Sequence, residues 1–163
     1  MTGLQVIRTM KGEDLAWVHA LNTVHQEMLS PLTPTALVAL VKSATFARVV
    51  EPDQAFLLAF DQSAAYQGVN FQWFRSRYER FVYVDRIAVD GKAQGKGLAR
   101  HLYDDLFRTA RAAGFPMITA EINSDPPNPG SDAFHEKLGF ETAGKARLDD
   151  RDKTVRYVIR ELA

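Results

Sequence analysis

The stretch Val82–Arg100, VYVDRIAVDGKAQGKGLAR, constrains this chain more than any other. Its first half alternates as a β-strand does, and it places Tyr83, Asp85, Ile87 and Val89 on one expected face. Its second half has glycines at 91, 95 and 97 ahead of an amphipathic repeat, which predicts a tight turn and then a helix. Unpaired N–H groups at the start of that helix, together with the helix dipole, would favour a bound phosphate.

Three kinds of phosphate-binding loop have glycines in comparable places. In a P-loop, G-x-x-x-x-G-K-[ST], the glycines stand one residue further apart than Gly91 and Gly95, and Ser or Thr occupies the position of Gly97. A dinucleotide fingerprint, G-x-G-x-x-G, requires glycine where this chain has Arg100, and it lies near the first strand. The third loop, Q/R-x-x-G-x-G/A, agrees with the chain. An ordinary glycine-rich turn is the alternative to all three.

Two motifs in the expected order resemble the GNAT (GCN5-related) N-acetyltransferase superfamily. Gln94, Gly97 and Ala99 match its pyrophosphate loop. The segment 128–140, NPGSDAFHEKLGF, is similar to its closing motif N-x-x-A-x-x-x-Y-x-x-x-G-F, with Ser131 in place of Ala and His135 in place of Tyr. The resemblance covers the chain from about residue 46 to its end. The earlier residues have no signature of the family.

This resemblance implies an α/β (α+β) fold, with a mixed six- to seven-stranded sheet and helices on both faces. In this acyl-CoA N-acyltransferase fold, strands four and five splay apart and acetyl-CoA lies between them. Residues 1–163 would form one domain that uses acetyl-CoA as co-substrate and needs no metal. The residues expected to hold the cofactor are Ile87, Ala88, Val89, Gln94, Gly95, Lys96, Gly97, Leu98, Ala99, Asn128, Ser131 and His135.

The implied reaction is attack of a neutral primary amine on a thioester, which needs a base because alkylamines are mostly protonated at pH 7. Asp85 is the first candidate, with a salt bridge to Arg86 as the alternative reading, and Glu121 on the fifth strand is the second. His25 and Glu27 are a third possibility. At the position of the family's tyrosine, His135 would either protonate the leaving thiolate or serve a structural role.

The remaining periodicity predicts helices and strands in alternation. Expected helices cover residues 13–22, 36–43, 70–78, 97–113 and a segment ending at 137, with Thr33 or Thr35, Asn70, and Ser131 or Asp132 as caps. Expected strands cover residues 4–8, 46–50, 55–60, 116–122 and 153–160, with a sixth beginning near 140. Residues 23–35 are expected to form a break, because Pro31 and Pro34 interrupt them.

Composition limits the partners. The 20 basic and 20 acidic residues balance, so neither nucleic acid nor a membrane surface is expected as a partner. No cysteine is present, which disfavours a covalent acetyl-enzyme and favours direct transfer. A small-molecule amine is the expected acceptor, and Arg75, Arg77 and Arg80, in an aromatic-rich segment, are candidates to pair with its carboxylate. No apolar run suggests a leader or a span, so a cytoplasmic location is expected.

Three other functions fit the same motifs. They are a non-catalytic acyl-CoA sensor, a protein N-terminal or lysine acetyltransferase, and a transferase of longer acyl groups. Pairing into a homodimer is expected only by analogy with the family.

Overall fold

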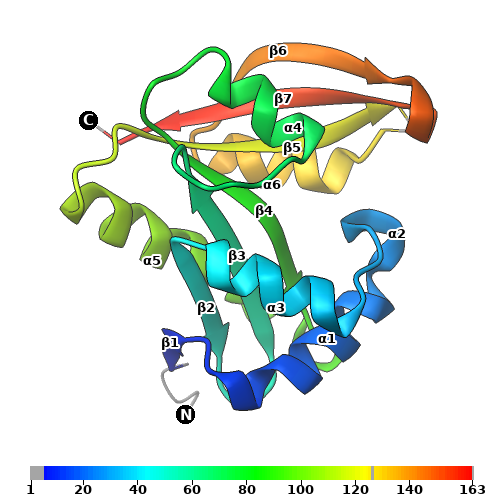
Figure 1. Ribbon diagram of the computed structural model, residues 1–163, viewed down its shortest axis with the longest axis vertical. Helices are drawn as coiled ribbons and strands as arrows, with labels where there is room; N and C mark the ends of the chain where they lie inside the picture. Colours follow the sequence, from blue (N-terminus) through cyan, green and yellow to red (C-terminus); the bar gives the residue numbers. More distant parts are fainter. Residues whose placement is uncertain (1–5, 126, 163) are drawn as a thin grey trace.

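The computed structural model describes residues 6–125 and 127–162, which build a seven-stranded sheet in the order β1-β2-β3-β4-β5-β7-β6 (Figure 1). Only β4 and β5 pair in parallel, and all other neighbours are antiparallel. The strands are β1 Ile7–Thr9, β2 Phe46–Val50, β3 Ala55–Asp61, β4 Val82–Val89, β5 Met117–Asp125, β6 Glu141–Leu148 and β7 Lys153–Glu161. The expected mixed sheet of this fold class is confirmed.

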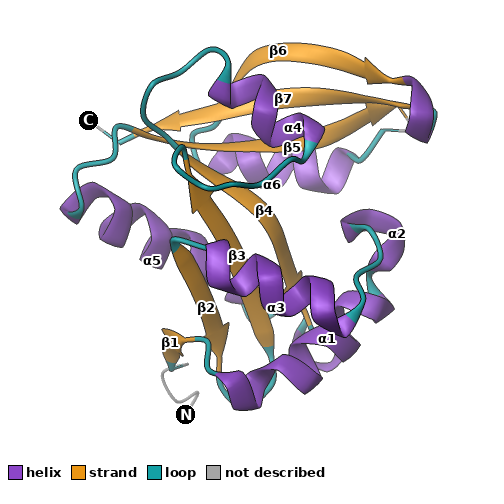
Figure 2. Cartoon of the chain, viewed as in Figure 1, coloured by secondary structure: helices purple, strands orange, loops and turns teal. Residues whose placement is uncertain are grey.

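Helices cover both faces of the sheet (Figure 2). They are α1 Leu15–Val24, α2 Gln26–Leu29, α3 Pro34–Ser43, α4 Val69–Arg75, α5 Leu98–Ala112 and α6 Pro129–Lys137, with 3-10 turns at Gly12–Asp14, Gly91–Ala93 and Asp149–Arg151. Side chains of α5 pack in one core cluster, while α1 and α3 pack in a second and α4 in a third. Strand residues alternate between these clusters, as a sheet buried on both faces requires.

Strands β4 and β5 separate after a short parallel contact. They pair only at Val82 with Ile118 and at Tyr83 with Thr119, although β4 continues to Val89 and β5 to Asp125. The edge of β4 that faces β5 therefore has no strand partner beyond Tyr83. This is the predicted splay, and it leaves main-chain groups that a ligand can pair with.

A β-bulge in β4 changes which side chains share a face. Leu58 pairs with Arg86 and Ala59 with Val84, so Asp85 is an extra residue without a partner on β3. As a result, Tyr83 packs in the cluster of α4, whereas Ile87 packs against the cluster of α5. The prediction of one common face for Tyr83, Asp85, Ile87 and Val89 is wrong, because simple alternation cannot anticipate a bulge.

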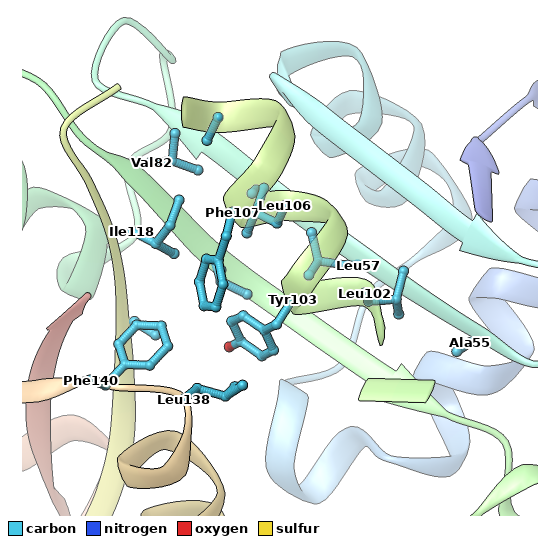
Figure 3. Packing of buried hydrophobic residues seen from close by; sticks show 14 of the residues in the cluster. Ala55, Leu57, Val82, Leu102, Tyr103, Leu106, Phe107, Ile118, Leu138 and Phe140 are labelled. Carbon is cyan, nitrogen blue, oxygen red and sulfur yellow. The ribbon is translucent and has the colours of Figure 1, made fainter. Parts of the chain in front are cut away.

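The helix α5 packs against β2, β3 and β4 on one face of the sheet. Leu102 and Leu106 are almost fully buried, at 1% and 0% exposure, and burial of each such side chain contributes roughly 1.5–3 kcal/mol. Tyr103 and Phe107 reach from the same helix toward Leu138 and the neighbouring Phe140 (Figure 3). Because this cluster includes residues of β3 and of β5, α5 holds the two parts of the sheet together.

Several predicted boundaries need correction. The break at 23–35 contains the short helix α2. Gly68, not Asn70, is the N-cap of α4, and the buried Asn70 side chain instead accepts a 2.8 Å hydrogen bond from the Tyr157 hydroxyl. Helix α6 starts earlier than expected, with Asn128 as its cap. Part of the first predicted strand, Leu4 and Gln5, lies outside the described residues.

Candidate active site

Two adjoining hollows, of about 190 and 210 Å³, lie where β4 and β5 part. The first extends toward Tyr103 and His135, and the second toward Tyr66 and Arg151. Both are lined by Met28, Leu29, Asp85, Arg86, Glu121 and Lys153. A larger hollow, of about 660 Å³, lies over β6 and β7 and contains none of the candidate site residues. The cleft at the splay is therefore the candidate site.

Glu121 stands at the boundary of the two hollows. It lies on β5 beside Tyr157 of β7, and its Oε2 accepts a 2.6 Å hydrogen bond from the Tyr83 hydroxyl. Burial raises the pKa of its carboxyl from 4.5 to about 7, and the charge of Asp85 adds to this, while the Tyr83 hydrogen bond and Lys153 oppose it. A carboxyl that titrates near neutral pH can both take and release a proton.

Asp85 is engaged by its neighbour in the chain. Arg86 Nε donates to Asp85 Oδ2 at 2.7 Å, and both side chains are about 5% exposed or less. Arg86 Nη1 also donates to Asn22 Oδ1 of α1 at 2.9 Å. The salt bridge that the sequence offered as the alternative for Asp85 is present. Because this carboxylate already neutralises a buried cation, Glu121 is the better placed base of the two.

His135 has a partner on each ring nitrogen. Its Nδ1 donates to the carbonyl of Ser131 at 2.8 Å, because a carbonyl oxygen only accepts, and its Nε2 lies 3.1 Å from the hydroxyl of Tyr103. In the neutral ring, Nε2 is then the acceptor and Tyr103 the donor. Burial lowers the pKa of His135, which favours this neutral form.

Tyr103 is a residue that the sequence analysis did not single out. It is 1% exposed, it lines the first hollow together with His135, and its hydroxyl lies 3.1 Å from His135 Nε2. The signal that was available is chemical, because a buried tyrosine hydroxyl needs a hydrogen-bond partner. A tyrosine hydroxyl therefore lies beside the side chain at position 135, where the family motif has tyrosine, but it belongs to α5.

The predicted phosphate loop has the backbone that such a loop requires. Gly95 and Gly97 adopt left-handed φ angles of 83° and 74°, which favour glycine. The helix α5 has no side-chain cap, and within the described chain the N–H groups of residues 98–100 make no hydrogen bond. Residues 94–97 are exposed. These N–H groups are free to donate to a ligand, and anion binding at this loop stays a prediction.

Of the other predicted cofactor residues, some line the first hollow and some line neither hollow. Asn128 and Ser131 line the first hollow, where Asn128 Oδ1 accepts from the Ser131 N–H at 3.2 Å. Ala88 and Val89 do not line either hollow, and the Val89 carbonyl accepts from Gln94 Nε2 and from His25 Nε2. Ile87 lines the first hollow. Leu98 is buried in the core, so only its main chain can meet a ligand.

The arginines of the aromatic segment lie outside both hollows. Arg77 stacks over Trp73 at 4.0 Å, and Arg80 over Phe115 at 4.8 Å. Most of the aromatic side chains of this segment form the packed cluster around Phe71 and Phe74. Tyr66 packs against this cluster and also lines the second hollow with Asp85. Burial raises the pKa of the Tyr66 hydroxyl, and the charge of Asp85 raises it further.

Within the described residues, no cluster of three or more His, Asp or Glu side chains is placed to bind a metal ion. In the same part of the chain, no helix is long and apolar enough to cross a bilayer.

Comparison with known proteins identifies the family. The model of the acetyltransferase (GNAT) family matches residues 20–140, and the chain belongs to this family. Curated relatives from Pseudomonas aeruginosa and Pseudomonas paraeruginosa, each an L-methionine sulfoximine/L-methionine sulfone acetyltransferase, are 37% identical over 75 residues. These residues are 46% of this chain and only 40% of each relative.

Solved structures show the same fold at low sequence identity. Ard1 from Thermoplasma volcanium has a TM-score of 0.77 at 14% identity, with 98% of each chain covered. The structure of yncA from Salmonella typhimurium with its cofactor acetyl-CoA has a TM-score of 0.71 at 19% identity, with 99% of this chain and 95% of that chain covered.

Proposed function

We propose that this protein transfers an acetyl group from acetyl-CoA directly to the primary amine of a small, amino-acid-like acceptor. The observation that supports this most is Glu121, a carboxyl with a pKa near 7 that is bonded to Tyr83 in the cleft between β4 and β5. A base that is poised near the working pH is what deprotonation of an ammonium group needs.

The residues present suit acetyl-CoA. The unpaired edge of β4 beyond Tyr83 can hydrogen-bond the amides of an extended pantetheine arm, as an added strand does. The free N–H groups at the start of α5 and the backbone of residues 94–97 suit its pyrophosphate. Bound there, acetyl-CoA supplies an activated thioester, and the chain supplies the groups that orient it and move protons.

Two proton transfers are assigned to named atoms. Glu121 takes a proton from the acceptor ammonium, directly or through water. Tyr103 turns its hydroxyl hydrogen from His135 Nε2, 3.1 Å away, to the leaving sulfur and gives it that proton, and a proton lost by the acceptor nitrogen restores the hydroxyl. His135 stays neutral and positions the hydroxyl before the reaction, since its own Nδ1–H is held by the carbonyl of Ser131. The chain has no cysteine to act as a nucleophile, which disfavours a covalent acetyl-enzyme.

The size of the cleft favours a small acceptor. The second hollow, at about 210 Å³, is below the roughly 300–1,000 Å³ that drug-sized ligands occupy. The curated relatives, which acetylate derivatives of an amino acid by name, support the same class. A protein terminus or lysine as acceptor is the second candidate. A cytoplasmic location fits both candidates.

The test is a panel of small amines and amino acids with acetyl-CoA, read by release of free thiol. We expect turnover with at least one member, and at neutral pH Glu121→Gln should lower kcat by roughly 100-fold or more, the range of a general base. His135→Gln should lower kcat less than Tyr103→Phe. Coenzyme A binding without turnover on any small molecule, peptide or protein would instead favour a sensor, and release of thiol before acceptor is added would contradict direct transfer.

A further inference from the structure

The buried guanidinium of Arg86 has a free nitrogen at the cleft. Two of its nitrogens are occupied, Nε by Asp85 at 2.7 Å and Nη1 by Asn22 at 2.9 Å. Within residues 6–125 and 127–162, Nη2 makes no hydrogen bond. In this part of the chain, Oε1 of Gln54 is the one side-chain nitrogen or oxygen that is both fully buried and without a hydrogen-bond partner. Since Nη2 of Arg86 also has no partner, it is not fully buried. Arg86 lines both hollows, and Nη2 is therefore open to them.

The position of this guanidinium is fixed before any ligand arrives. Asp85 belongs to the bulge of β4 and Asn22 to α1, and Asn22 is itself held by a 3.1 Å hydrogen bond to the carbonyl of Ser30. With two partners on different elements, the side chain loses little entropy when a third binds. An arginine with a free, preorganised edge in a cleft is suited to a planar oxyanion such as a carboxylate.

Cations predominate in the second hollow. Arg86, Arg151 and Lys153 line it together with Asp85 and Glu121. Asp85 is already paired with Arg86, and Arg151 only meets the exposed Asp150 at 4.0 Å. Even with Glu121 ionised, the lining has one positive charge in excess, and this excess rises to two once Glu121 takes a proton from the acceptor, so the lining favours an acceptor with a carboxylate.

The mouth of the same hollow is apolar. Met28 and Val69, which are 54% and 46% exposed, are among the few large apolar side chains on the described surface, and both line it with Leu32. An apolar rim next to a cationic wall suits an acceptor that has a carboxylate at one end and a short apolar side chain at the other.

We propose that the second hollow binds the carboxylate of an α-amino acid on Arg86 Nη2, with Lys153 adding positive charge and the apolar rim receiving the side chain. This inference names the class of acceptor for the acetyl transfer proposed above, and its role in catalysis rests on that proposed function. Arg86 then gives the site its preference for amino acids over amines without a carboxylate, whereas Glu121 deprotonates either kind of acceptor.

The experiment measures binding, so that it does not depend on turnover. Protein saturated with coenzyme A is titrated calorimetrically with the standard L-amino acids and L-methionine sulfone, and each ligand that binds is compared with its own carboxamide, which has the same shape without the charge. We expect at least one acid to bind, and its carboxamide to bind roughly 10- to 100-fold more weakly, as for loss of a charge-assisted hydrogen bond.

Substitutions then identify which residues cause the difference in affinity between acid and carboxamide. Arg86→Gln should bring the acid-to-amide ratio close to one, and Lys153→Gln should lower it severalfold. Arg77→Gln, which removes an arginine outside the cleft, should leave it unchanged. If Arg86→Gln does not fold, the wild-type ratio and Lys153→Gln decide. The proposal is overturned if no acid binds, if acid and amide bind equally, if a folded Arg86→Gln keeps the full ratio, or, where Arg86→Gln does not fold, if Lys153→Gln keeps it. Acetyl transfer, measured separately on the same panel, tests the enzyme function by itself.

Discussion

Replacement of Glu121 by glutamine should make the protein more stable above neutral pH. The carboxyl has a pKa of about 7 in the folded protein against 4.5 ordinarily, because burial disfavours its charged form. A raised pKa means that the folded state is favoured while the group is protonated, and that this advantage is lost as the pH rises through about 7. Glutamine keeps the neutral shape at every pH and can still accept from Tyr83.

The magnitude follows from the same values. At about 1.4 kcal/mol per pH unit, a carboxyl shifted from 4.5 to about 7 costs the wild type roughly 2.5 kcal/mol more at pH 8.5 than at pH 5. Since Glu121 is only partly shielded from solvent, we expect the stability gain of Glu121→Gln to grow by about 2 kcal/mol over that interval.

Urea denaturation at pH 5 and pH 8.5 measures this directly. The matched control is Glu141→Gln, which makes the same change on an exposed carboxylate at the start of β6, and it should track the wild type at both values. An advantage of Glu121→Gln that is equal at the two pH values, or larger at pH 5, would refute the assignment of a raised pKa and with it the choice of Glu121 as base.

Three further outcomes are expected. Tyr103→Phe should lower kcat by roughly 10- to 1,000-fold with little change in KM for the acceptor, measured by thiol release, because only the proton donor is lost. Gly97→Ala should cost about 1 kcal/mol of stability, because the φ of 74° at this position is left-handed, and it should weaken coenzyme A binding in calorimetry. Gly91→Ala is the control and should change neither quantity, because Gly91 has an ordinary φ and open space around it. Asn128→Ala should lower the free energy of unfolding by about 1 kcal/mol in denaturant titrations, because it removes the side-chain cap of α6.

The sequence was most informative where local rules act. Periodicity predicted α5 and its end near Gly114, and both are confirmed because an amphipathic repeat and a C-terminal glycine are local signals. The two motifs likewise predicted the family and the splayed pair of strands. Boundaries failed where a competing residue decided the cap, as with Asn128 ahead of Ser131, or where a side chain found a distant partner, as Asn70 found Tyr157.

The candidate site also combines features that depend on neighbouring residues with features that depend on distant ones. The backbone of the proposed phosphate loop could be predicted from the sequence, because left-handed glycines and a helix start are properties of neighbouring residues. The surroundings that distinguish the proposed acid–base groups could not be predicted in this way. The bulge at Asp85, the pairing of that carboxylate with Arg86, the burial that raises the pKa of Glu121, and the meeting of Tyr103 with His135 all join residues from different elements. Desolvation and hydrogen bonding depend on what surrounds a group in space, and the packing of α1, α5, β4 and β5 against one another sets those surroundings.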